Sequence, residues 1–219
     1  MFSPVVIKMI VRGLGETLYM TLLSTALAYV LGLPLGVILV ITEKDGLCPN
    51  IYLNKILNVV INLTRSVPFL ILLVAVLPLT RAIVGTTIGS SATVVPLVIA
   101  AAPFIARLVE SSLKEVDIGV IEAAQSMGAN PKEIIYKVLL PEALPSLIVG
   151  AAIAVTTILS YSAMAGFVGG RGLGTIAINY GYHRYQKDIM FITVALLVIV
   201  VQVLQEIGMK LAAVFDKRK

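Results

Sequence analysis

Long apolar runs that lack Asp, Glu, Lys and Arg are the dominant pattern along the chain. A helix needs about 20 mostly apolar residues to cross a hydrocarbon layer of about 30 Å, and four runs satisfy this requirement without any charge. A fifth run is interrupted by Arg65, which we place near a membrane surface where its guanidinium reaches water. The pattern predicts five transmembrane helices, at about 17–42, 56–79, 82–106, 146–168 and 189–211.

The composition is that of a membrane protein. Apolar residues make up 58% of the 219 residues and charged residues 13%, against about 45–50% and about 25% in soluble domains. This balance disfavours a soluble enzyme, a disulfide-rich secreted scaffold and a disordered tail. The net charge of +5 indicates orientation rather than nucleic-acid binding. Lys and Arg are more frequent on the side of the 107–142 connection and the C-terminus, which predicts a cytoplasmic C-terminus and an outside N-terminus.

The connection 107–142 is the longest polar insertion, and its pattern predicts a helical hairpin. Residues 117–127 place apolar side chains at helical spacing, and Gly128 follows as a C-terminal stop. Asn130 is positioned to cap a second short helix that starts with Pro131. Two interpretations fit this hairpin: an amphipathic element that lies on lipid, or a docking element for a cytoplasmic partner.

The same connection carries a spaced motif. It reads Glu122-Ala123-Ala124, then Gly128, Val138 and Leu140-Pro141. This spacing resembles the EAA loop of the membrane subunits of bacterial ATP-binding-cassette (ABC) importers, although that family usually has Ile where this chain has Val138. Further stretches, at 65–69, 101–107, 139–145 and 161–164, resemble one subfamily, the permease subunits of bacterial methionine importers.

The resemblance implies a type I ABC importer permease fold: an all-α integral membrane bundle forming one domain over 1–219, with 107–142 as cytoplasmic coupling loop. It implies a multi-pass protein of the bacterial inner membrane that forms the path for L- and D-methionine and works as a homodimer with a second copy of itself. It further implies two ATP-binding-cassette ATPase subunits and an extracytoplasmic methionine-binding lipoprotein as partners. ATP and Mg would be bound by the ATPase, and this subunit would hold no cofactor. The residues that the resemblance assigns to ATPase coupling are Glu122, Ala123, Ala124, Gly128, Leu140 and Pro141.

The positions of the acidic residues and the absence of one motif indicate, independently of the resemblance, how transport is driven. No carboxylate lies at the middle of a predicted span, where proton-driven transporters commonly keep one, so proton symport is disfavoured. The phosphate-binding pattern G-x-x-x-x-G-K-[S/T] is absent, so any ATP hydrolysis must belong to another polypeptide. Two alternatives stay open: a permease for another small solute such as a polar amino acid, and a stand-alone secondary transporter.

The fourth predicted span supplies candidates for a solute path, namely Tyr161, Ser162 and Met164. Hydroxyl groups can hydrogen-bond an ammonium or carboxylate group, and a methionine thioether is polarizable and adaptable. The alternative is packing between helices, which is the favoured interpretation for Thr156 and Thr157. The glycine-rich stretch 166–174 is expected to be a flexible outer loop or gate rather than a nucleotide site. We expect no catalytic residues and no metal site, and His183 is interpreted as a surface histidine.

Overall fold

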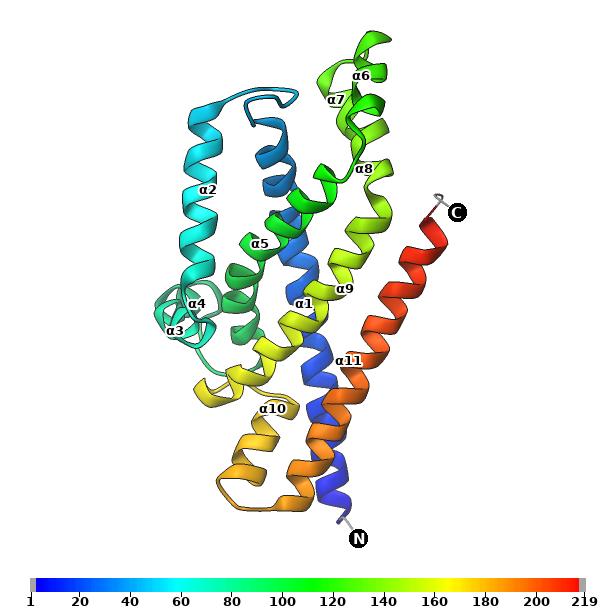
Figure 1. Ribbon diagram of the computed structural model, residues 1–219. Coiled ribbons are helices and arrows are strands. Elements are labelled where there is room, and N and C mark those ends of the chain that lie inside the picture. The colour runs from blue at the N-terminus through cyan, green and yellow to red at the C-terminus, as the bar shows by residue number, and fades with distance from the viewer. Residues whose placement is uncertain (1–2, 217–219) are drawn as a thin grey trace. The chain divides into compact units, whose positions relative to one another are not determined.

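The computed structural model describes residues 3–216, which form helices and turns with no β-strand among them (Figure 1). In chain order the elements are α1 Pro4–Ile41, α2 Ile51–Ser66, α3 Phe69–Ala75, α4 Leu77–Val84, α5 Ser90–Lys114, α6 Ile118–Ser126, α7 Pro131–Ile134, the π-helix η1 Ile135–Leu139, α8 Leu140–Glu142, α9 Leu144–Met164, the 3-10 helix η2 Ala165–Val168, α10 Leu173–Ile176, the π-helix η3 Ala177–Tyr182 and α11 Lys187–Phe215. Among the described residues, four stretches are long and apolar enough to cross a membrane: α1, α5, α9 with η2, and α11. The bent pair α2 and α3 would make a fifth.

The second expected span, 56–79, is not one helix. The chain turns by 103° between α2 and α3, and α4 follows at Leu77. The break lies at Val67 and Pro68, where Pro68 has φ −57° and ψ 135°. Proline lacks the N–H that an α-helix needs and disfavours helical backbone at the residue before it. The apolar run therefore continues across a break between two helices, which the hydropathy of the sequence does not reveal.

The third expected span, 82–106, is displaced toward the C-terminus. Its first residues belong to α4 and a turn in which Gly85 and Gly89 have φ of +80° and +106°. Left-handed backbone of this kind favours glycine and ends a helix. At the other end α5 continues to Lys114, so residues 107–114, expected in the coupling loop, are helical.

The described chain packs as two compact units that are each built from separate segments. Of the described residues, one unit contains 3–28, 67–101 and 154–205, and the other contains 29–66, 102–153 and 206–216. Each of α1, α5, α9 and α11 contributes residues to both units.

In the first unit, the glycine-rich stretch is packed rather than loose. Gly172 and Gly174 are buried, and a Cβ on Gly174 would lie 2.4 Å from the Cα of Ala163. The Leu173 N–H donates a 2.9 Å hydrogen bond to the Thr17 hydroxyl on α1. The expectation of a flexible loop is wrong here, because the glycines provide space for neighbouring backbone instead of freedom.

In the second unit, α1 and α5 approach closely through glycines. A Cβ on Gly32 would meet Ile105 at 2.7 Å, and a Cβ on Gly36 would meet Val109 at 2.6 Å. The core that forms beside this contact contains Leu39, Ile61 and Ala106, with Leu35 and Leu57 packed against it. These contacts fix the end of α1 against α5, which is the helix that leads into the hairpin.

Candidate functional site

The predicted hairpin is confirmed, and its first helix is fixed at both ends by local chemistry. The Asp117 side chain caps α6 by accepting a 2.7 Å hydrogen bond from the Gly119 N–H. At the other end the Gly128 N–H donates to Gln125 O at 2.9 Å, and the Ala129 N–H donates to Ala124 O at 3.1 Å. This pair of bonds is a Schellman motif, and it requires the left-handed φ of +83° at Gly128.

The second helix of the hairpin begins with a capping box. The Asn130 side chain accepts a 3.0 Å hydrogen bond from the Glu133 N–H, and the Glu133 carboxylate accepts a 3.2 Å bond from the Asn130 N–H. Lys137 forms an ion pair with the same carboxylate at 3.1 Å. The backbone hydrogen bond from Asn130, together with Lys137, lowers the pKa of Glu133 below its ordinary value.

The residues expected to couple to an ATPase are divided between the surface and the interior. Glu122, Ala123, Gly128 and Pro141 are exposed, while Leu140 is half-buried and Ala124 is buried. Two apolar side chains beside them are also open, with Ile118 68% and Met127 82% exposed. The hairpin thus exposes apolar side chains beside small and acidic ones, on a backbone that its caps hold in place.

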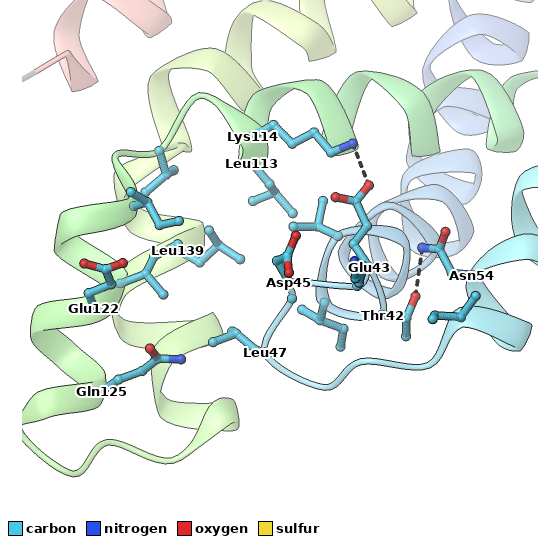
Figure 2. A pocket seen from close by; sticks show the side chains of 18 residues that line it. Thr42, Glu43, Asp45, Leu47, Asn54, Leu113, Lys114, Glu122, Gln125 and Leu139 are labelled. Atoms are coloured by element: carbon cyan, nitrogen blue, oxygen red, sulfur yellow. Dashed lines mark hydrogen bonds and ion pairs between the residues drawn. The ribbon is translucent and has the colours of Figure 1, made fainter.

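A cavity of about 900 Å³ lies against this hairpin within the second unit (Figure 2). One wall is α6, with Ile118, Ile121, Glu122 and Gln125, and the facing wall is the segment 40–47 that ends α1 and begins the connection to α2. Figure 2 shows Gln125 and Leu47 pointing toward one another from these walls. Further lining residues are Ile51 and Asn54 of α2, and Leu113, Lys114, Val116 and Leu139.

A chain of charges at the end of α5 borders this cavity, and sequence reasoning did not identify it. Lys114 Nζ lies 2.6 Å from Glu43 Oε1 and 2.9 Å from Glu110 Oε1. Arg107 forms an ion pair with the other oxygen of Glu110 and donates a 2.7 Å hydrogen bond to Asn58 on α2. The signal for the part on α5 was present in the spacing, since residues 107, 110 and 114 fall on one face of a helix.

The three path candidates, which belong to the first unit, have different surroundings. The Tyr161 ring stacks on Phe69 of α3, with centroids 4.5 Å apart and planes 5° from parallel. Ser162 is buried, and its hydroxyl donates to Leu159 O within its own helix at 2.7 Å. Met164 is 42% exposed and lines an apolar cavity of about 520 Å³ with Ser160, Phe167 and Gln202. Tyr161 and Ser162 do not line that cavity, so the three residues do not form one pocket.

His183 is exposed and lies edge-on to the Tyr182 ring. Within residues 3–216 there is no group of three or more His, Cys, Asp or Glu side chains that could hold a metal ion.

Residues 32–218 match the family model of the binding-protein-dependent transport system inner membrane component. The chain belongs to this family. The permease is 55% identical over 203 residues to the probable D-methionine transport system permease protein MetI of Vibrio cholerae, which covers 93% of this chain and 90% of that protein. It is 50% identical over 158 residues to the D-methionine transport system permease protein MetI of Escherichia coli K12, which covers 72% of this chain and 73% of that protein.

Solved structures agree with this membership. A chain in an inward-facing structure of the MetNI methionine ABC transporter matches the permease with a TM-score of 0.97 and 45% identity, over 99% of this chain and all of that one. An amino acid ABC transporter chain matches with a TM-score of 0.77 at 20% identity, over 97% of this chain and 94% of that one, which is a likeness of fold alone. The permease is therefore a multi-pass inner-membrane subunit of the ABC importer type, with a role in transport rather than catalysis.

Proposed function

We propose that the permease forms the path for methionine in an ATP-driven importer and is moved by a separate ATPase subunit. The observation that carries this proposal is the coupling hairpin, whose turn and caps are fixed while Glu122 and Ala123 stay exposed. A chain without a phosphate-binding motif does not hydrolyse ATP itself, so a separate ATPase subunit must do so. An exposed hairpin with a well-defined backbone gives such a subunit a surface to bind. The names of the relatives support methionine as the solute.

The assembly that we propose contains two copies of the permease, two ATPase subunits that bind ATP and Mg, and a methionine-binding lipoprotein on the outer side. The hairpin and the C-terminus face the cytoplasm and the N-terminus faces outward, as the distribution of Lys and Arg predicts. Closed two-fold symmetry would place both copies of α9 beside one path. Binding of ATP and solute at separate sites then biases one conformational equilibrium.

We place Met164 and Tyr161 in the solute path. Met164 supports this role because its partly exposed side chain lines an apolar cavity, and its polarizable thioether suits the side chain of methionine. Tyr161 is held by its stack on Phe69, so its hydroxyl has a defined direction. Ser162 contributes by shaping the helix through its bond to Leu159 O.

The decisive experiment is reconstitution of the complex purified through a tagged permease. We expect a Walker-type ATPase to copurify at equal stoichiometry, and proteoliposomes to accumulate labelled L- and D-methionine only with ATP and the binding lipoprotein. Uptake by the permease alone would overturn the proposal in favour of a secondary transporter. Competition with unlabelled polar amino acids tests the solute, since equal competition by any of them would remove methionine as the specific cargo.

A further inference from the structure

The cavity beside the hairpin has a second wall that the coupling loop does not explain. Residues 42–47 belong to the connection between α1 and α2, far from the hairpin in sequence, yet they face Glu122 and Gln125 of α6 across the same space (Figure 2). A volume of about 900 Å³ is ample for a side chain or a short segment of another molecule.

This second wall is preformed. Three backbone hydrogen bonds fold the connection: Gly46 N–H to Glu43 O at 3.1 Å, Cys48 N–H to Ile41 O at 2.8 Å and Asn50 N–H to Thr42 O at 3.0 Å. The 2.6 Å ion pair between Glu43 and Lys114 ties it to the last residue of α5, just before the cap of α6. The two walls are therefore linked at their base, and little conformational entropy is lost when a partner binds between them.

The chemistry of the lining indicates what fits. The lining is mixed: apolar side chains such as Leu47, Leu113 and Leu139 alternate with polar and charged ones. Within residues 3–216, Asp45 and Glu122 line the cavity without an ion-pair partner, and so does Lys44. Lys114 already contacts two carboxylates, so its charge is neutralised.

The uncompensated charge at the cavity is therefore negative on balance. A lysine or arginine side chain matches it, because its aliphatic stem covers apolar surface while its charged end reaches the carboxylates. A lipid phosphate would instead meet two carboxylates of its own sign.

We propose that this cavity receives a basic side chain of the ATPase subunit, which makes the connection 42–47 a second docking element beside the coupling hairpin. The inference rests on the proposed function, because it presupposes an ATPase partner. The inference adds that the ATPase subunit contacts both α6 and the connection 42–47. A movement of the ATPase would then displace the end of α1 together with the hairpin.

The permease supplies its own probe for this idea. Cys48 is the single cysteine in the sequence, and it is exposed at the end of the docking connection. We expect a maleimide to label Cys48 in permease stripped of its ATPase subunits and the intact complex to protect it. Equal labelling in both states overturns the inference. The inference is also overturned if Cys48 becomes protected in stripped permease when anionic vesicles are added, because lipid would then occupy the cavity. The same holds if protection appears when the permease concentration is raised, because a second copy would then occupy it.

Charge reversal tests the chemistry. An ion pair at an exposed rim contributes up to about 1 kcal/mol, or about fivefold in affinity, and reversal adds repulsion. We expect Asp45→Lys to weaken ATPase association about five- to tenfold. The matched control is Asp188→Lys, an exposed carboxylate in the first turn of α11 that should leave association unchanged.

If Asp45→Lys and Asp188→Lys behave alike while both keep the thermal stability of the wild type, the inference fails. In that case the wild-type complex still contains its ATPase and still transports, so the proposed function stands. If no ATPase copurifies with the wild type, the proposed function itself has failed, and the two outcomes are distinguishable.

Discussion

Substitution of Gly128 tests the coupling hairpin most directly, because it changes backbone energy and little else. The residue has φ +83°, and an added Cβ would meet no atom within 4 Å. An alanine there costs about 1–2 kcal/mol from the left-handed backbone alone, a factor of about 5 to 30 against the native turn. A valine destabilises the turn more than an alanine, because a β-branched residue very rarely adopts a positive φ. Asparagine costs less, since its side chain tolerates the left-handed region.

The chain contains a matched control in Gly85. It has φ +80°, ends α4, and likewise offers open space to a Cβ. Gly85→Ala should therefore lower the thermal stability about as much as Gly128→Ala, without affecting the hairpin. We expect Gly128→Val to lower methionine uptake per ATP hydrolysed in proteoliposomes, and Gly128→Asn to stay near the wild type. The reasoning is refuted if Gly128→Val transports normally, or if Gly85→Val uncouples ATP hydrolysis from uptake to the same extent.

Three further predictions concern single side chains. Glu110→Ala should lower the free energy of unfolding by about 1–2 kcal/mol in a thermal-shift or denaturant assay, because Arg107 and Lys114 lose a buried carboxylate while Lys114 keeps its ion pair with Glu43. An unchanged value would contradict a structural role for these ion pairs. Hydrogen bonding lowers the pKa of Glu133, so its stabilisation is complete at neutral pH and is lost as the pH falls through the folded-state pKa. The difference in melting temperature between wild type and Glu133→Gln should therefore shrink from neutral pH to about pH 3, and a difference that is constant with pH would exclude this role. Met164→Ala should raise the KM for uptake while the complex stays assembled, and unchanged kinetics would remove Met164 from the path.

The hairpin was predictable because its determinants are local. Expected at 117–127, its first helix runs from Ile118 to Ser126, with Asp117 as the cap and Gly128 in the left-handed turn. The second helix follows from Asn130 and Pro131 in the same way. Caps and turns depend on residues within a few positions of one another, so a single sequence contains the information that they require.

The second and third spans were misjudged because hydropathy measures composition and not backbone conformation. The chain turns by 103° at Pro68, within the second expected span. Gly85 ends α4 within the third expected span. Both signals were visible as single residues, although a single Pro or Gly lowers the mean hydropathy of such a run too little to mark a break. The glycine-rich stretch illustrates a different limit, since the partners that make Gly172 and Gly174 necessary, Thr17 and Ala163, become neighbours only in the fold.

The charges at the end of α5 depend partly on local spacing and partly on contacts that form only in the folded chain. Their spacing on one helix face could be read from the sequence. Glu43, in the connection after α1, and Asn58, on α2, are distant in sequence and could not be assigned as partners. Moving α5 relative to these partners would break the Arg107–Asn58 hydrogen bond and the partly exposed Lys114–Glu43 ion pair, at a cost of about 1 kcal/mol each. The end of α5 is consequently joined to α2 and to the connection after α1, close to where the hairpin begins. If the hairpin is the coupling element that we propose, its displacement would therefore be transmitted to these neighbouring segments as well as to α5.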